Sequence, residues 1–382
     1  MTSVEAPRHL YVHVPFCGRR CSYCDFAIAV RRSVPWHAFN DAIMAELATR
    51  SIALDPGAIS SIYFGGGTPS KLGAEGIRAL LTGFAHRLGV DNLSTLSGNP
   101  EITIEVNPED VTEQAAAVWA AAGVNRASLG VQSFDPSVLQ WMHREHGPED
   151  SARAARTLRA GGIGSLSLDL IFALPDHLAR DWPRDLELAL ALDPDHLSLY
   201  GLTVEPKTPL GRWTARGEVA EAPEERFESE FLAAHDALGA AGYEHYEVSN
   251  YGRPGHRAVH NSAYWSGAPY LGLGPSAHGF DGISRRWNIS AYAAWSDAVE
   301  AGADPVAGRE DLAATDRLAE DVYLGLRTVD GLTIHQTDMM TVMPWIEQGW
   351  ARVEGGRLIL SPRGWLRLDA LAVALTSVRS RS

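Results

Sequence analysis

The most constraining feature of this 382-residue sequence is a short loop that holds all three of its cysteines. The loop reads Cys17-Gly-Arg-Arg-Cys21-Ser-Tyr-Cys24, and no cysteine occurs elsewhere in the chain. A four-iron cluster is fully ligated by four thiolates. Three cysteines at this spacing therefore predict a [4Fe–4S] cluster that leaves one iron open to an exchangeable ligand.

Two other uses of the cysteines have to be considered. A structural zinc site uses three cysteines and one histidine, and His9 or His13 stands near enough in sequence to serve. Such sites usually combine two short-spaced ligand pairs, and the sequence has no second pair. A disulfide would leave one thiol over and would need an oxidising compartment. The spacing favours the iron–sulfur cluster.

Composition narrows the class of protein. The formal net charge of -14 argues against a nucleic-acid-binding surface, which would need a basic face. A hydrophobic content of 45% and a charged content of 21% are typical of a soluble globular protein. The N-terminus lacks the pattern of a signal peptide, and no apolar run is long enough to predict a membrane span. An oxygen-sensitive cluster on free thiolates suits the reducing cytoplasm, so we expect a cytoplasmic protein.

The first half of the chain alternates strand-like and helix-like segments, which predicts an α/β fold with a parallel sheet. Six units of this kind predict a partial (β/α)6 barrel, with its distinctive loops gathered at the C-terminal ends of the strands. The expected strands are Leu10–Phe16, Ser61–Phe64, Glu101–Val106, Ala127–Val131, Ser165–Ile171 and His196–Tyr200, and the expected helices between them are Trp36–Leu54, Ala74–Leu88, Glu113–Ala122, Glu149–Ala160 and Trp182–Ala191.

Three segments are expected along the chain: a barrel core over 1–205, a barrel extension over 206–289, and a mainly helical, winged-helix-like domain over 290–382. In the extension, a helix over Ala222–Ala241 and a strand over Tyr243–Tyr251 precede a loop-rich stretch, Gly252–Asn288. In the last segment, helices over Thr315–Arg327, Thr337–Gln348 and Arg363–Leu375 surround a hairpin within Trp350–Leu360.

Polar or glycine-rich motifs follow the predicted strands, where a barrel would build its active site. Gly65-Gly66-Gly67-Thr68-Pro69 either lets the backbone approach a ligand closely or makes a tight turn. Glu105 ends the third strand, where it is either a partner for a ribose hydroxyl or an exposed acid. Gln132 ends the fourth strand and offers an amide.

Two further charged residues are candidates for ligand binding. Arg144 could form a two-pronged contact with a carboxylate, or a surface ion pair. Asp169 lies within the apolar run Leu166–Leu174, where an acid without a partner would be costly.

Together these motifs resemble the radical S-adenosylmethionine (SAM) proteins, and more specifically the oxygen-independent coproporphyrinogen dehydrogenase family in its shorter heme-chaperone branch. The matching stretches are Leu10–Phe26, Tyr63–Ser70, Glu101–Pro108, Asn125–Phe134, Leu168–Pro175, His196–Leu210, Gly242–Tyr251, His260–Trp265 and Tyr270–Gly279. The resemblance implies that SAM occupies the open iron of a cluster on Cys17, Cys21 and Cys24. It also implies SAM contacts from Tyr11, Tyr23, Gly67, Thr68, Glu105, Gln132, Arg144 and Asp169.

Two departures separate the branches. The dehydrogenases that this chain resembles carry a longer segment before the cysteine loop, and a further cysteine just after the third ligand, where Phe26 stands here. Both differences favour a heme chaperone, which binds heme and passes it to an acceptor protein. The alternative is SAM-dependent oxidative decarboxylation of coproporphyrinogen III to protoporphyrinogen IX.

The remaining motif, His260-Asn261-Ser262-Ala263-Tyr264-Trp265, matches the heme-binding HNxxYW motif proposed for the chaperone branch. Histidine is a common axial ligand to heme iron, so His260 is expected to bind the iron, with Tyr264 and Trp265 against the macrocycle. A packed loop with a structural histidine is the other interpretation. His278 is a second candidate ligand, and His13 is either a proton donor or a buried structural residue.

The resemblance also implies partners: a heme-accepting apoprotein such as a respiratory heme protein, and an electron donor such as flavodoxin or ferredoxin.

Overall fold

The computed structural model describes residues 6–50, 54–55, 57–96 and 98–381. Its centre is a curved sheet in which six parallel strands stand in the order β1-β4-β5-β6-β7-β8. Their bounds are β1 (His9–Val14), β4 (Ser61–Gly66), β5 (Glu101–Val106), β6 (Arg126–Gln132), β7 (Ser165–Phe172) and β8 (His196–Gly201). The predicted partial six-stranded barrel is confirmed.

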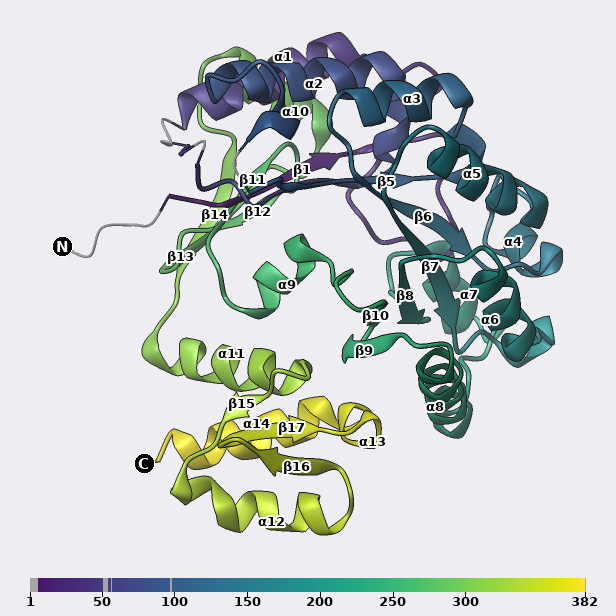
Figure 1. Ribbon diagram of the computed structural model, residues 1–382, viewed down its shortest axis with the longest axis vertical. Coiled ribbons are helices and arrows are strands. Elements are labelled where there is room, and N and C mark those ends of the chain that lie inside the picture. The colour runs from purple at the N-terminus through teal and green to yellow at the C-terminus, as the bar shows by residue number, and fades with distance from the viewer. Residues whose placement is uncertain (1–5, 51–53, 56, 97, 382) are drawn as a thin grey trace.

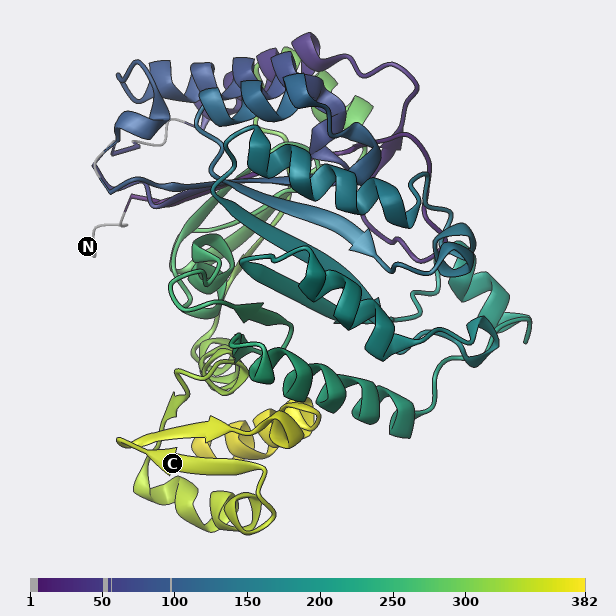
Figure 2. The same ribbon diagram turned by 45° about the vertical axis from the view of Figure 1, so that its right-hand side comes forward.

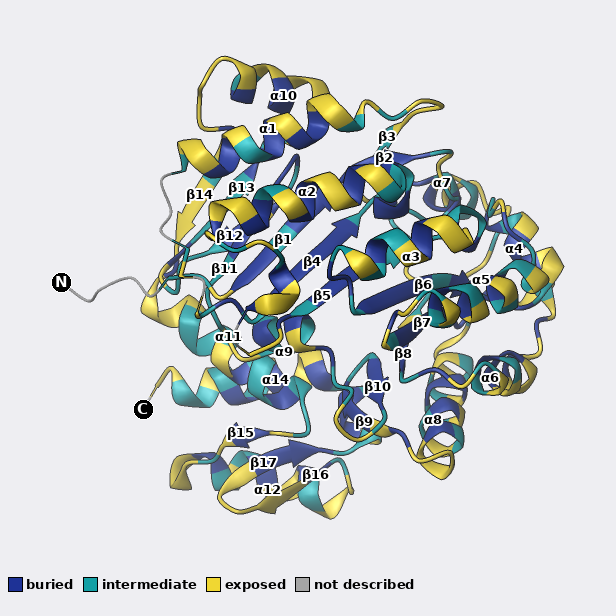
Figure 3. Cartoon of the chain, turned by 45° about the horizontal axis from the view of Figure 1, so that its top comes forward, coloured by how far each residue is buried: buried dark blue, intermediate teal, exposed yellow. Residues whose placement is uncertain are grey.

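Helices cover the convex face of this sheet (Figure 1). They are α1 (Trp36–Thr49), α2 (Gly73–Arg87), α3 (Glu113–Ala121), α5 (Pro148–Ala160), α6 (Trp182–Ala191) and α8 (Glu224–Ala240). In Figure 3 the central strands β4, β5 and β6 are dark blue, whereas α1, α2 and α3 are yellow on the outside and blue towards the sheet. Burial of both faces explains why the strands are short apolar runs in the sequence.

The first predicted strand is interrupted. Residues 10–16 were expected to form one strand, but β1 ends at Val14, and the separate β2 (Phe16–Cys17) pairs with β3 (Ala29–Val30) instead. Pro15 lies between β1 and β2 and has no N–H to donate to a ladder. The break turns the chain away from the sheet directly before the cysteine loop.

The loop-rich stretch 252–288 holds more regular structure than the sequence predicts. It contains α9 (Val259–Trp265) and the strands β11 (Tyr270–Leu273), β12 (His278–Phe280) and β13 (Ser284–Asn288), which extend the sheet beyond β1. Strands β11 and β12 approach closely at Gly272, where a Cβ would lie 1.8 Å from the carbonyl oxygen of His278. Because this position requires glycine, the apolar pattern that predicts a strand is interrupted there. At the other edge, the predicted strand 243–251 is two antiparallel strands, β9 (Glu244–Glu247) and β10 (Asn250–Gly252).

The last segment is divided between the barrel and a separate unit. Helix α10 (Tyr292–Glu300) packs on α1, and β14 (Val306–Asp311) joins the main sheet beside β13. The three-stranded sheet β15-β17-β16 lies with its helices below the barrel (Figure 2). Its elements are β15 (Leu332–Thr333), α12 (Met339–Glu347), β16 (Ala351–Glu354), β17 (Arg357–Leu360), α13 (Pro362–Trp365) and α14 (Leu368–Arg379), and α11 (Ala314–Arg327) packs on α14.

Among the described residues, no helix combines the length and the apolar character that crossing a bilayer requires.

Candidate cofactor site

A cavity of about 400 Å³ lies at the C-terminal ends of the barrel strands. Most residues predicted to bind the cluster and SAM line it, although they come from six separate parts of the chain. These residues are Cys17, Cys21, Tyr23, Cys24, Gly67, Thr68, Glu105, Gln132, Arg144 and Asp169. The fold thus brings to one place what the sequence showed only as separate motifs.

The cysteine loop is held by short backbone contacts on either side of the first cysteine. Ala29 N–H donates to the carbonyl of Pro15 at 2.7 Å, and Arg31 N–H donates to that of Cys17 at 2.9 Å. The Cys17 sulfur lies 3.3 Å from the hydroxyl oxygen of Thr68. This contact ties the cysteine loop to the glycine-rich turn.

The three thiols fit ligation by a cluster. All three line the same cavity, and burial raises the pKa of the Cys24 thiol to about 11. Across the described parts of the chain, no three His, Cys, Asp or Glu side chains lie close enough together to hold one metal ion. Three thiols at one cavity match the three cysteine ligands of a four-iron cluster that leaves one iron open.

Close packing requires glycine in the glycine-rich turn, which also lies at the cavity. A Cβ at Gly66, whose φ is +110°, would lie 2.5 Å from the His13 ring, and one at Gly67 would lie 2.7 Å from the backbone of Pro15. Only glycine therefore fits against β1 at these two positions. Gly67 and Thr68 line the cavity beside the first cysteine.

Two carboxyl groups face the interior of the barrel mouth. Glu105 accepts hydrogen bonds from the Tyr63 hydroxyl at 2.8 Å and the Gly66 N–H at 3.1 Å. Asp169 accepts a hydrogen bond from the Ser128 hydroxyl at 3.0 Å. Burial is the main cause that raises the pKa of Glu105 to about 7 and that of Asp169 to about 6. Carboxyl groups of this kind can accept hydrogen bonds from a ribose or attract a cation.

Arg144 provides the cavity with a positive charge. Its guanidinium donates to the side-chain oxygen of Asn107 at 2.8 Å and to the Gly130 carbonyl at 2.9 Å. Its Nε is buried and has no hydrogen-bond partner among the residues that the structure describes. Another guanidinium nitrogen lies 3.8 Å from the Cys21 sulfur. The side chain is therefore fixed beside the cluster loop, with one donor left for a bound carboxylate.

Tyr11 differs from the other predicted SAM contacts. It does not line this cavity but an adjoining cleft, and its hydroxyl lies 3.1 Å from Nδ1 of His13. Its ring stacks on that of Tyr63, with the centroids 6.2 Å apart. His13 is buried, and its Nε2 lies 2.9 Å from the Ala27 carbonyl oxygen. Of the two interpretations of His13, this environment favours the structural one.

The structure gives His260 no free nitrogen. His260 is 1% exposed, its Nδ1 lies 2.7 Å from the Ser61 hydroxyl, and its Nε2 lies 2.9 Å from the Tyr264 hydroxyl. Ser61 is the first residue of β4, so the imidazole points to the N-terminal end of the barrel, away from the cysteine loop. His260 is the predicted heme ligand, but in this structure both of its ring nitrogens already contact protein hydroxyl groups.

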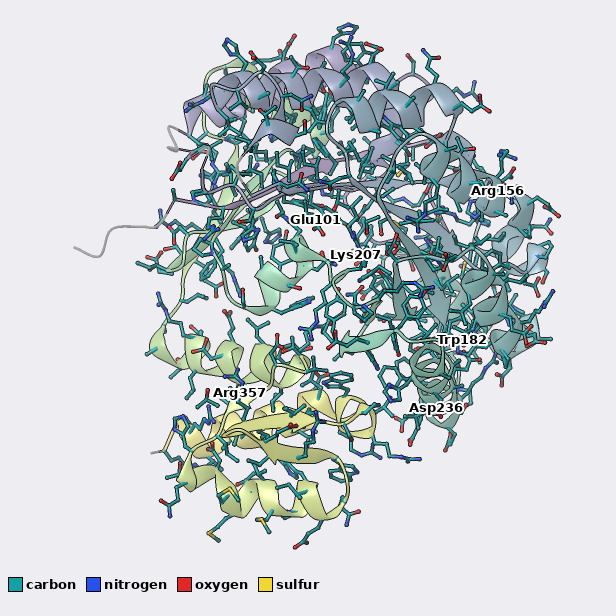
Figure 4. All side chains as sticks on the ribbon, in the orientation of Figure 1. Glu101, Arg156, Trp182, Lys207, Asp236 and Arg357 are labelled. Atoms are coloured by element: carbon teal, nitrogen blue, oxygen red, sulfur yellow. The ribbon has the colours of Figure 1, made fainter. Side chains whose placement is uncertain are left out.

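The two ends of α9, which carries the HNxxYW motif, have different surroundings. The carboxylate of Glu101, at the start of β5, accepts hydrogen bonds from the Val259 and His260 N–H groups at 3.0 and 2.9 Å. Figure 4 labels Glu101 close to α9 on the concave side of the sheet. Tyr264 and Trp265, at the C-terminal end of α9, both line the cleft that Tyr11 lines.

Sequence analysis missed several residues that shape the site. Tyr63, Asn107 and Ser128 hold Glu105, Arg144 and Asp169 through the hydrogen bonds described above. Asn107 lies in a motif already noted after the third strand, so its position was a usable signal. Tyr63 and Ser128 are polar residues within largely buried strands, but the neighbouring sequence does not indicate which residues they contact.

Comparison with known proteins agrees with this geometry. Residues 11–189 match the family model of the radical SAM superfamily. The fold is similar to that of "Coproporphyrinogen III oxidase (HemN) from Escherichia coli", with a TM-score of 0.78 and 22% identity, covering 98% of this chain and 91% of that one. A parallel barrel with a three-cysteine loop at its C-terminal edge thus defines a radical SAM protein.

Full-length sequence relatives narrow the family. The heme chaperone HemW of Mycobacterium tuberculosis is 36% identical over 375 residues, which cover 97% of this chain and 95% of the relative. The HemW of Escherichia coli is 38% identical over 274 residues, covering 72% and 70%. A mitochondrial radical SAM domain-containing protein 1 of Danio rerio is 32% identical, covering 95% and 83%. The chain belongs to the HemW family of radical SAM proteins.

Membership of this superfamily implies a [4Fe–4S] cluster and SAM. The residues of the cavity fit both: three thiols for the cluster, the buried Nε of Arg144 for a carboxylate, and two half-buried carboxyl groups for hydroxyl groups or a cation. When bound, the cluster supplies an electron that can cleave SAM.

Proposed function

We propose that this chain is a heme chaperone: it binds a [4Fe–4S] cluster, SAM and heme, and transfers the heme to an acceptor protein. The observation that carries the proposal is the 36% identity to a heme chaperone over 97% of this chain and 95% of the relative. The match extends beyond the radical SAM domain, which ends at residue 189, and so includes the parts outside the barrel core.

In this proposal each part of the chain has its own task. The barrel core, 1–205, holds the cluster on Cys17, Cys21 and Cys24, and holds SAM against Tyr23, Gly67, Thr68, Glu105, Gln132, Arg144 and Asp169. The extension, 206–289, supplies Tyr264 and Trp265 for the heme. In the segment 290–382, α10 and β14 complete the barrel side, and the elements from α11 onwards pack together below the barrel.

The rival function is that of a coproporphyrinogen dehydrogenase, and Phe26 weighs against it. Phe26 is 61% exposed and lines the cofactor cavity just after the third cysteine. Dehydrogenases that this chain resembles carry a cysteine there. An exposed phenylalanine can contact a flat apolar ligand but cannot provide a thiol.

Partners are proposed from the surface beside the cluster. Arg19 and Arg20 are exposed between the first two cysteines, so the loop presents positive charge to an acidic electron carrier such as a flavodoxin or ferredoxin. The acceptor is an apoprotein that receives heme, for example a respiratory heme protein. A cluster on thiolates suits the reducing cytoplasm, where we propose that the protein acts.

One preparation can test the proposal. Anaerobically reconstituted protein is titrated with ferric heme, and the same sample is incubated with coproporphyrinogen III, SAM and a reductant. The proposal expects saturable binding of one heme per chain and no protoporphyrinogen. Turnover of coproporphyrinogen without heme binding would replace it with the dehydrogenase function.

A further inference from the structure

A second cleft, of about 650 Å³, adjoins the cofactor cavity. Its volume lies within the roughly 300–1,000 Å³ typical of ligand pockets. Asp25, Phe26, Gly66 and Glu105 line both spaces, so the two spaces share a wall. A ligand in the cleft would lie directly beside the cluster and SAM.

The walls of the cleft suit a flat, largely apolar molecule. Six aromatic side chains line it: Tyr11, Phe26, Tyr264, Trp265, Tyr270 and Phe280. Aromatic rings offer large rigid apolar surfaces for stacking and edge contacts. Arg285 also lines the cleft and forms an ion pair with Glu320 of α11 at 2.6 Å. A guanidinium at the edge of an aromatic cleft suits the carboxylate of a porphyrin propionate.

His278 differs from the other histidines near the cleft. Its side chain is exposed, and within the described residues neither ring nitrogen makes a hydrogen bond, whereas both nitrogens of His13 and of His260 are engaged. The ring stacks on Trp287 of the neighbouring strand at 6.0 Å, which orients it. Partial burial and the nearby Arg285 lower the pKa of His278, which favours its neutral form.

We infer that this cleft is the heme site and that His278, rather than His260, is the axial ligand to the iron, with Arg285 contacting a propionate. The inference rests on the proposed function and names its binding site. Tyr264 and Trp265 keep their predicted place against the macrocycle. His260 instead holds α9, and with it these two aromatic residues, against the barrel.

Ferric heme titration of cluster-free protein, followed by absorption spectroscopy, tests the inference. His278→Ala should lose the imidazole-ligated spectrum and weaken heme binding at least about tenfold, since changes even in the outer shell of a metal site typically cost 10–100-fold. His278→Met should keep binding but shift the spectrum towards that of a thioether ligand. Free imidazole should restore the wild-type band to His278→Ala.

Two controls make the result decisive. His86→Ala removes an exposed histidine on α2 and should leave the spectrum and affinity unchanged. His260→Ala should keep the imidazole-ligated spectrum in whatever fraction of it remains folded by circular dichroism. If wild type binds heme and His278→Ala binds it with the same spectrum and affinity, the inference is wrong although the chaperone function stands. If wild type binds no heme, both are wrong.

Discussion

The two ends of the barrel are built differently, although both are rich in polar side chains. At the N-terminal ends of the strands, Ser61 and Glu101 are the first residues of β4 and β5, and both bind α9. At the C-terminal ends, Glu105, Asp169 and the three cysteines line a cavity. Burial raises the pKa of Glu105, Asp169 and Cys24, and the buried Nε of Arg144 has no hydrogen-bond partner among the described residues. Polar groups that satisfy one another away from a cavity stabilise a fold, whereas ionisable groups with shifted pKa values that line a cavity are candidates for ligand binding.

This difference explains why one sequence motif has two roles. In the HNxxYW motif, His260 points to the N-terminal ends of the barrel strands, whereas Tyr264 and Trp265 line the cleft. The first turn of α9 is anchored to the first residues of β4 and β5, and its last two residues line the cleft where we propose that heme binds. Variants at the two ends should therefore have separable effects on stability and on ligand binding.

The largest effect is expected at the cysteine loop. Cys21→Ala should abolish the visible absorption of the anaerobically reconstituted protein, because no other cysteine can replace the lost ligand. Iron content and absorption measure the loss. Heme binding by the same variant should remain, since Cys21 does not line the cleft. One zinc per chain with no capacity for iron would contradict the cluster assignment.

Asp169 should affect SAM but not heme. Asp169→Ala removes a buried acceptor, and one charged hydrogen bond is worth about 1.5–3 kcal/mol, or roughly ten- to hundredfold in affinity. Calorimetric SAM titration measures the change, with the exposed Asp91→Ala as control. Glu105→Gln should weaken both ligands, because Glu105 lines both spaces. Unchanged SAM affinity in Asp169→Ala would remove this residue from the site.

Contacts at the N-terminal ends of the strands should contribute to the free energy of unfolding. His260→Ala leaves the Tyr264 hydroxyl without its partner and opens a cavity, so the free energy of unfolding should fall by about 1–3 kcal/mol. Urea denaturation measures it, and His86→Ala should stay within about 0.5 kcal/mol of wild type. An unchanged stability together with lost heme binding would return His260 to the role of ligand.

The smallest effect is a pH dependence of SAM binding. Glu105 and Asp169 have pKa values of about 7 and about 6, so both gain negative charge between pH 5.5 and pH 8. SAM carries positive charge, so its affinity should rise severalfold over this range. The same raised pKa values mean that the SAM-free protein loses stability as pH rises from about 4 to 7, because the folded state holds these protons longer than the unfolded chain. A flat affinity profile would show that neither group faces the ligand.

The sequence predicted the barrel because its strands are apolar runs between amphipathic helices. It did not predict β11–β13, which are short, partly exposed and rely on Gly272 for close approach. Nor did it predict α9, whose N-terminus is capped by Glu101, more than 150 residues earlier in the chain. A helix cap provided by such a distant residue cannot be predicted from the sequence around the helix.

The same reasoning applies to the candidate site. Most residues that converge on the cofactor cavity lie in the C-terminal half of a strand or in the connection that follows it, and barrel topology places such residues together. The hydrogen bonds of His260 to Ser61 and Tyr264 depend on which way α9 faces, which no motif records. The motif therefore predicts His260 as the heme ligand, and only the hydrogen bonds of the folded chain give a reason to prefer the second candidate, His278.

The most direct test of two separate sites is a heme titration of reconstituted protein that is already saturated with SAM. The account predicts that one heme still binds per chain, with an imidazole-ligated spectrum and without release of SAM. Displacement of SAM by heme, or conversion of added coproporphyrinogen III to protoporphyrinogen IX by the same sample, would contradict it.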